Sequence, residues 1–144
     1  MTRDDRGQSL VEFALILPVL LILLVGMFDL GRAVLLSETL NSAVREGTRY
    51  AIVHGALSSA PLGPATLTTP PDADNAATAL VRAHATGINS TLTIVMSWPD
   101  GNAARGSEVT ITATAPYTPI LSQVFTGGGL AVTLRSGSTM VIQQ

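Results

Sequence analysis

The sequence contains an uninterrupted apolar run that begins at Phe13 and ends at Phe28, and this run limits the folds open to the chain. Its sixteen residues, about twenty with the four before them, approach the roughly 20 that a helix needs to cross a bilayer core of about 30 Å. A secretory signal core is shorter, at about 7–15 residues. No small-residue cleavage pattern follows, because the run leads directly into Asp29 and Arg32. We therefore expect a retained membrane-spanning helix.

Glu12 stands at the entrance of this run. A carboxylate near the bilayer midplane costs on the order of 2.5–3.5 kcal/mol, so such residues usually have a partner or a function. Near one end of a span the cost falls, and a glutamate there can reach interfacial water. Taken alone, Glu12 therefore fits both an interfacial residue and a functional one.

The helix is predicted to continue beyond the membrane. Asp29 and Arg32 lie three residues apart, as do Glu46 and Arg49, and each pair supports a helix by a few tenths of a kcal/mol. We expect a transmembrane helix over 8–30 and an amphipathic extension over 31–54. After Phe28, apolar residues recur at three- and four-residue steps: Leu30, Ala33, Val34, Leu36, Leu40, Ala43, Val44, Tyr50 and Ala51.

The remainder divides into a Pro/Gly/Ser-rich loop over 55–71 and a domain over 72–144. Within the domain, Asp72 and Asp74 favour a helix start and Gly87 a helix end, so a helix is expected over about 72–86. Alternating apolar residues predict three strands within 91–98, 109–115 and 130–142, and Gly137 inside the last predicts a bulge. The expected fold is α+β. A long N-terminal membrane-spanning helix continues into a small domain with one further helix and a three-stranded antiparallel sheet.

Composition argues against several functions. The net charge is −2 and the eight basic residues, all arginine, form no cluster, so no nucleic-acid partner is expected. Cysteine is absent, which excludes disulfides and thiolate metal sites. His54 and His84 stand thirty residues apart, and the carboxylates form no paired motif. We expect no catalytic residues, no metal, no organic cofactor and no small-molecule substrate, and hence no enzyme.

Three blocks of sequence, residues 6–18, 28–33 and 43–51, resemble one protein family. Residues 6–13, RGQSLVEF, resemble the prepilin-like signal of tight-adherence (Flp-type) pili. Together with residues 14–18, ALILP, residues 28–33, FDLGRA, and residues 43–51, AVREGTRYA, they resemble the TadE-like family of pilus assembly proteins and minor pseudopilins. The resemblance implies a pilin-like domain and a role in the biogenesis of adhesive pili.

The same resemblance assigns roles to single residues. A dedicated prepilin peptidase would cut between Gly7 and Gln8, and Glu12 and Phe13 would contact other pilins or assembly proteins. Asp29, Arg32, Arg45, Glu46 and Arg49 would form the helix motif. Residues 1–7 would be a cytoplasmic leader, and the remainder a single-pass protein of the plasma membrane with its C-terminal domain outside. Positive charges near the span do not by themselves favour this orientation.

A different class of function also fits the residues. The protein would then be an uncleaved, signal-anchored binding module outside the cytoplasm, whose sheet or loop 55–71 contacts a partner. In that case the leader is retained, and pilus formation does not depend on the chain.

Overall fold

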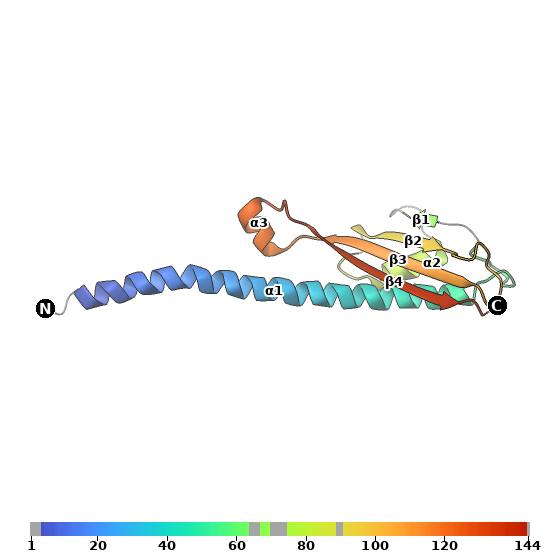
Figure 1. Cartoon of the computed structure of the whole chain (residues 1–144), viewed down its shortest axis with the longest axis horizontal. Coiled ribbons are helices and arrows are strands. Elements are labelled where there is room, and N and C mark those ends of the chain that lie inside the picture. The colour runs from blue at the N-terminus through green and yellow to red at the C-terminus, as the bar shows by residue number, and fades with distance from the viewer. Residues whose placement is uncertain (1–3, 64–66, 70–74, 89–90, 144) are drawn as a thin grey trace. The chain divides into compact units, whose positions relative to one another are not determined.

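The structure is a computed structural model that describes residues 4–63, 67–69, 75–88 and 91–143. These residues cluster into two compact units, which we describe separately. Unit 1 comprises Met1–Ala33 and Thr118–Ala131, and unit 2 comprises Val34–Tyr117 and Val132–Gln144. The elements in chain order are α1 (Asp4–Ile52), β1 (Leu67–Thr69), α2 (Ala76–His84), β2 (Thr93–Ser97), β3 (Glu108–Tyr117), α3 (Ile120–Thr126) and β4 (Val132–Val141) (Figure 1).

The predicted long helix is present as α1, which runs without interruption through Pro18. Leucine, valine and isoleucine dominate its first half, and these residues favour or tolerate a helix. Proline lacks the N–H that would bond one turn back, but it does not end the helix here. None of the most apolar part of α1 is buried in the single chain, so it is no core helix of a soluble domain.

Unit 2 is built on an antiparallel sheet in the order β1-β2-β3-β4. The period-two pattern holds, because Ile94 and Met96 in β2 and Val109 and Ile111 in β3 are fully buried while their neighbours are more exposed. The α+β class and the predicted strands are confirmed. The ladder between β3 and β4 keeps one register from end to end and pairs Thr112 with Gly137, so the predicted bulge at Gly137 is wrong.

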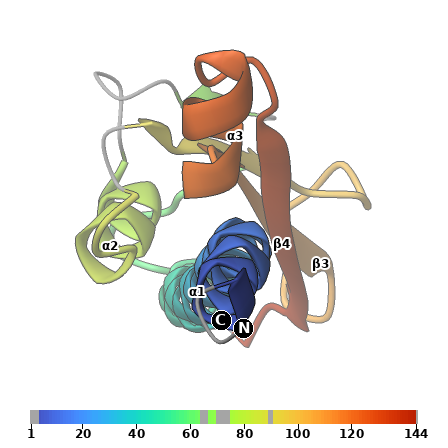
Figure 2. The same cartoon turned by 90° about the vertical axis from the view of Figure 1, so that its left-hand side faces the viewer.

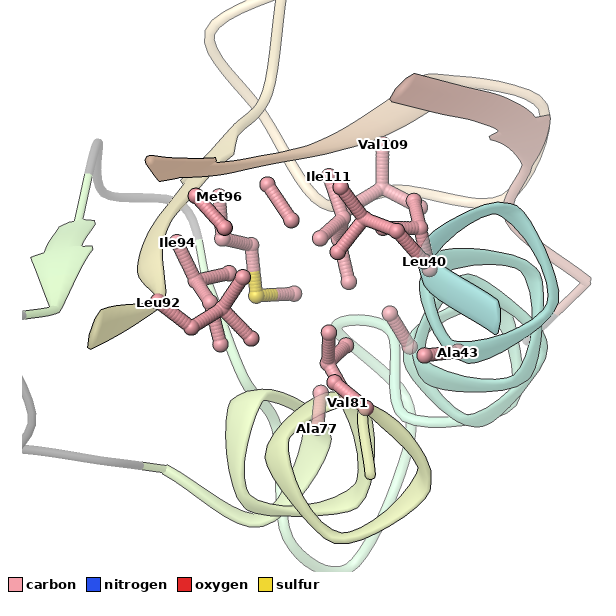
Figure 3. Packing of buried hydrophobic residues seen from close by; sticks show 14 of the residues in the cluster. Leu40, Ala43, Ala77, Val81, Leu92, Ile94, Met96, Val109 and Ile111 are labelled. Carbon is pink, nitrogen blue, oxygen red and sulfur yellow. The ribbon is translucent and has the colours of Figure 1, made fainter. Parts of the chain in front are cut away.

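Two helices supply the rest of this core. Figure 2 looks along α1 and shows α2 beside it, and Figure 3 shows side chains of both helices facing the strands. Leu40 and Ala43 from α1 and Ala77 and Val81 from α2 are fully buried. Full burial of a side chain the size of Leu40 contributes about 1.5–3 kcal/mol. The C-terminal half of α1 is therefore part of the domain's core.

α2 begins at Ala76 because Asn75 caps it. The Asn75 side chain accepts from the Thr78 N–H at 2.9 Å, and the Thr78 hydroxyl accepts from the Asn75 N–H at 2.9 Å. This reciprocal capping satisfies two N–H groups that the helix start leaves free. The predicted start at Asp72 lies outside the described residues. Gly87 has a φ of +86°, the left-handed conformation expected of it.

The segment predicted as a loop is tied to the sheet at several points. β1 lies within it and pairs with β2, an additional strand that its composition did not indicate. Gly63 lies flat against the indole of Trp98, where a Cβ would come within 2.3 Å of the ring. The Ala56 N–H donates to the Ala103 carbonyl at 2.8 Å. These contacts hold the described part of the loop on unit 2.

Candidate functional site

The start of α1 presents Gly7 and Glu12 on an open surface. A Cβ on Gly7 would meet nothing within 4 Å, and the Gln8 side chain donates to Glu12 Oε1 at 3.2 Å. Glu12 is exposed, one turn of helix beyond Gln8. The carboxylate therefore lies near the residue that would become the amino terminus if the chain were cut after Gly7.

The apolar surface that follows is exposed over most of its length, with Val25 and Gly26 half-buried. Phe13 is 61% exposed, and Leu23 and Phe28 are 66% and 73% exposed. Exposed apolar surface on this scale marks a site that contacts lipid or protein. The first half of α1 is thus a contact surface and is not part of a folded core.

Asp29 has a role that the sequence did not predict. Its side chain is only 6% exposed, and its two carboxylate oxygens accept from the N–H groups of Ile120 and Leu121, each at 2.9 Å. These are the first residues of α3, whose N-cap residue, Pro119, offers no side-chain acceptor. The helix motif residue Asp29 therefore caps a helix that begins 91 residues further along the chain.

The sequence did not predict α3. Hydrogen bonds from nearby residues satisfy the polar groups at its C-terminal end. Ser122 is buried, and its carbonyl accepts from the Gly128 N–H at 3.1 Å and the Thr126 hydroxyl at 2.8 Å. The Ser122 hydroxyl accepts from the Leu130 N–H at 3.0 Å. Gly127, at φ +66°, is the left-handed C-cap. The turn at Gly127 and Gly128 therefore ends α3.

Arg45, Glu46 and Arg49 lie elsewhere, on the exposed face of α1 in unit 2. They line a polar hollow of about 330 Å³ together with Glu38, Asn41 and Ser42. The Ser136 hydroxyl of β4 donates to the side-chain oxygen Oδ1 of Asn41, which fixes one edge of this face. Arg32 is exposed and belongs to unit 1 with Asp29. The predicted helix motif is thus divided between the two units.

Gly47 lies on the opposite, buried face of this segment. A Cβ at Gly47 would come within 2.2 Å of Val81 Cγ2 and 3.1 Å of the Ala77 carbonyl oxygen, both in α2. Glycine therefore allows α1 and α2 to approach closely. The motif block at residues 43–51 combines a buried face for this contact with a polar face toward solvent.

The two histidines have local partners. His54 Nδ1 donates to the Tyr50 carbonyl at 2.8 Å, and its ring stacks on that of Tyr50 with centroids 4.0 Å apart. His84 Nδ1 donates to the Leu80 carbonyl at 2.9 Å. Among the described residues, no three His, Cys, Asp or Glu side chains gather as metal ligands would. The geometry offers no acid–base constellation at either histidine.

One exposed apolar helix that leads into an α+β domain fits a single-pass membrane anchor. Residues 7–49 match the model of the family described as TadE-like protein. The chain thus carries a TadE-like segment, which confirms the recognition made from its N-terminal motifs and indicates involvement in Tad pilus assembly. This family is structural and pilus-related, not enzymatic. No curated protein and no solved structure matches the chain.

Proposed function

We propose that the protein is a minor pseudopilin of Tad pilus biogenesis, held in the plasma membrane by the first half of α1. The N-terminus is cytoplasmic and the C-terminal domain is outside. The observation that carries the proposal is that the TadE-like match coincides with an exposed apolar helix that has Gly7 and Glu12 at its start. Its partners are a prepilin peptidase and other pilins or assembly proteins.

Processing would hydrolyse the peptide bond between Gly7 and Gln8 and leave a free amino group on Gln8. Gly7 lies in the first turn of α1, where backbone N–H groups lack helical partners. Glycine costs a helix about 1 kcal/mol relative to alanine. Both effects favour local unwinding there, which a peptidase needs to bring the backbone into its active site.

Glu12 would then serve in assembly. In a filament its carboxylate would be buried among apolar helices, at a high cost for an unpaired charge. The new amino group of a neighbouring subunit carries the opposite charge and offsets that cost. Glu12 would thus select processed neighbours and set the axial position of one subunit against the next.

Replacing Glu12 by alanine is expected to leave membrane insertion intact and to reduce pilus incorporation severalfold, because the exposed side chain contributes little to the fold. The measurement compares immunoblots of membrane and sheared-pilus fractions and counts pili by electron microscopy. Glu38→Ala, an exposed glutamate on the same helix, is the control and should assemble normally. Normal piliation in the Glu12→Ala strain would remove the proposed role.

A further inference from the structure

We propose that residues 118–131 form a second membrane-embedded element. In this arrangement α3 lies beside α1 in the leaflet that the C-terminal end of the span reaches, with Val124 and Phe125 against lipid acyl chains. The inference goes beyond the assembly role. It rests on the membrane anchorage of α1, which the experiment below checks separately.

The depth of α3 follows from its contacts within unit 1. Asp29, the first charged residue after the apolar run, bonds to the start of α3, and Leu21, Ile22 and Val25 line a common groove with it. Leu21 and Asp29 are eight residues apart, or about 12 Å along a helix. One leaflet of the hydrocarbon core is about 15 Å thick. With Asp29 at the boundary, the residues of α1 that contact α3 lie inside hydrocarbon.

The surface of this element is apolar and continues that of α1. The groove between the two helices, about 180 Å³, is lined by apolar side chains alone. Val124 is 72% exposed and Phe125 is 63% exposed. No charged residue occurs between Glu108 and Arg135. Contact of this apolar surface with water is unfavourable, whereas acyl chains would cover it and the adjoining face of α1 together.

The backbone hydrogen bonds of residues 118–131 suit the hydrocarbon core of a membrane. A membrane core tolerates non-spanning backbone only where its polar groups are satisfied within the protein. Asp29 satisfies the N–H groups of Ile120 and Leu121, and the Pro119 carbonyl accepts from the Gln123 N–H at 3.2 Å. Ser122 accepts from the N–H groups of Gly128 and Leu130. A water-exposed turn has no need of a buried carboxylate for its first N–H groups, because water would serve.

The experiment uses the full chain, which has no native cysteine, in phosphatidylcholine and phosphatidylglycerol vesicles at low protein density. Single-cysteine variants carry the fluorophore NBD at position 124 (Val124→Cys), at position 23 in the span (Leu23→Cys) or at position 104 on an exposed turn (Ala104→Cys). Quenching of the NBD fluorescence is measured with doxyl groups on the lipid acyl chains and with iodide on both sides of the vesicle membrane. The unmodified chain is also photolabelled with an acyl-chain diazirine lipid, and adducts are mapped by mass spectrometry.

We expect position 124 to behave as position 23 does, with a blue-shifted emission, strong acyl-chain quenching and weak iodide quenching, and we expect adducts within 118–131. Iodide quenching at position 124 equal to that at position 104, with no adducts in 118–131, would overturn the proposal. A label at position 124 that neither iodide nor acyl-chain doxyl quenches would also overturn it. That result would indicate that a second copy of the chain, and not lipid, covers the apolar surface of α3. If the label at position 23 were itself exposed to water, both the membrane anchorage of α1 and this inference would fail.

Discussion

Replacement of Asp29 by alanine is expected to detach α3 from α1 and to unfold it locally. The two N–H groups of Ile120 and Leu121 would lose a carboxylate acceptor in a buried setting. Hydrogen bonds to charged groups contribute about 1.5–3 kcal/mol each, so the loss is about 3 kcal/mol or more. A seven-residue helix is too short to persist alone in water, and its unpaired N–H groups are costly in lipid.

Spin labels on unit 1 measure the detachment of α3 from α1 directly. Val19→Cys and Gln123→Cys together place one label on α1 and one on α3. Pulsed electron–electron double resonance then gives the distribution of distances between the two labels. The parent should give a narrow distribution, and Asp29→Ala a broad one. Asp29→Asn keeps one acceptor and should fall between them, while Glu38→Ala should match the parent. A distribution unchanged by Asp29→Ala would show that the carboxylate does not hold α3.

Replacement of Gly47 by alanine is expected to destabilise the α+β domain by about 1–3 kcal/mol, the usual cost of overpacking a core. The added methyl would overlap a fully buried valine, Val81, whose β-branched side chain has one preferred rotamer in a helix. It would also press on the backbone carbonyl of Ala77, so α2 would have to shift. The helix propensity gained by alanine, about 1 kcal/mol, is already included in this net expectation.

The single tryptophan, Trp98, is buried in unit 2 and reports the unfolding of that unit. For a domain of roughly 60–100 residues, each kcal/mol lowers the melting temperature by about 4–8 °C. Thermal unfolding of the full chain in detergent, followed by tryptophan fluorescence, should therefore show a fall of at least about 4 °C for Gly47→Ala by the same relation. Gly31→Ala, on the same helix with no atom within 4 Å of the added carbon, should not lower it. Equal melting of Gly47→Ala and the parent would contradict the close packing.

Features with a local physical signature were predictable from the sequence. The span from Phe13 to Phe28 follows from hydropathy, and the strands follow from alternation, because burial on one face of a sheet imposes a period of two. The α+β class followed from these elements, and the similarity of residues 7–49 to the TadE-like family followed from three motif blocks. In each case neighbouring residues carry the whole pattern.

Features set by distant contacts were missed. α3 is short, and its cap comes from Asp29, 91 residues earlier, so no side chain beside Ile120 caps the helix start. The partial signal was a proline at the N-cap position within an uncharged apolar stretch. Gly47 looked like an ordinary helical residue because its role depends on Val81 across the core. Gly137 indicated a bulge, but the strand pairs regularly through it, with Gly137 opposite Thr112.

The N-terminal residue of the membrane-purified protein tests the pseudopilin role most directly. Intact-mass and peptide mass spectrometry would be applied to protein from cells with and without the prepilin peptidase. We predict a chain that begins at Gln8 when the peptidase is present and at the original N-terminus when it is absent. An intact leader in both strains would contradict processing, and would leave an uncleaved, membrane-anchored binding module as the function to pursue.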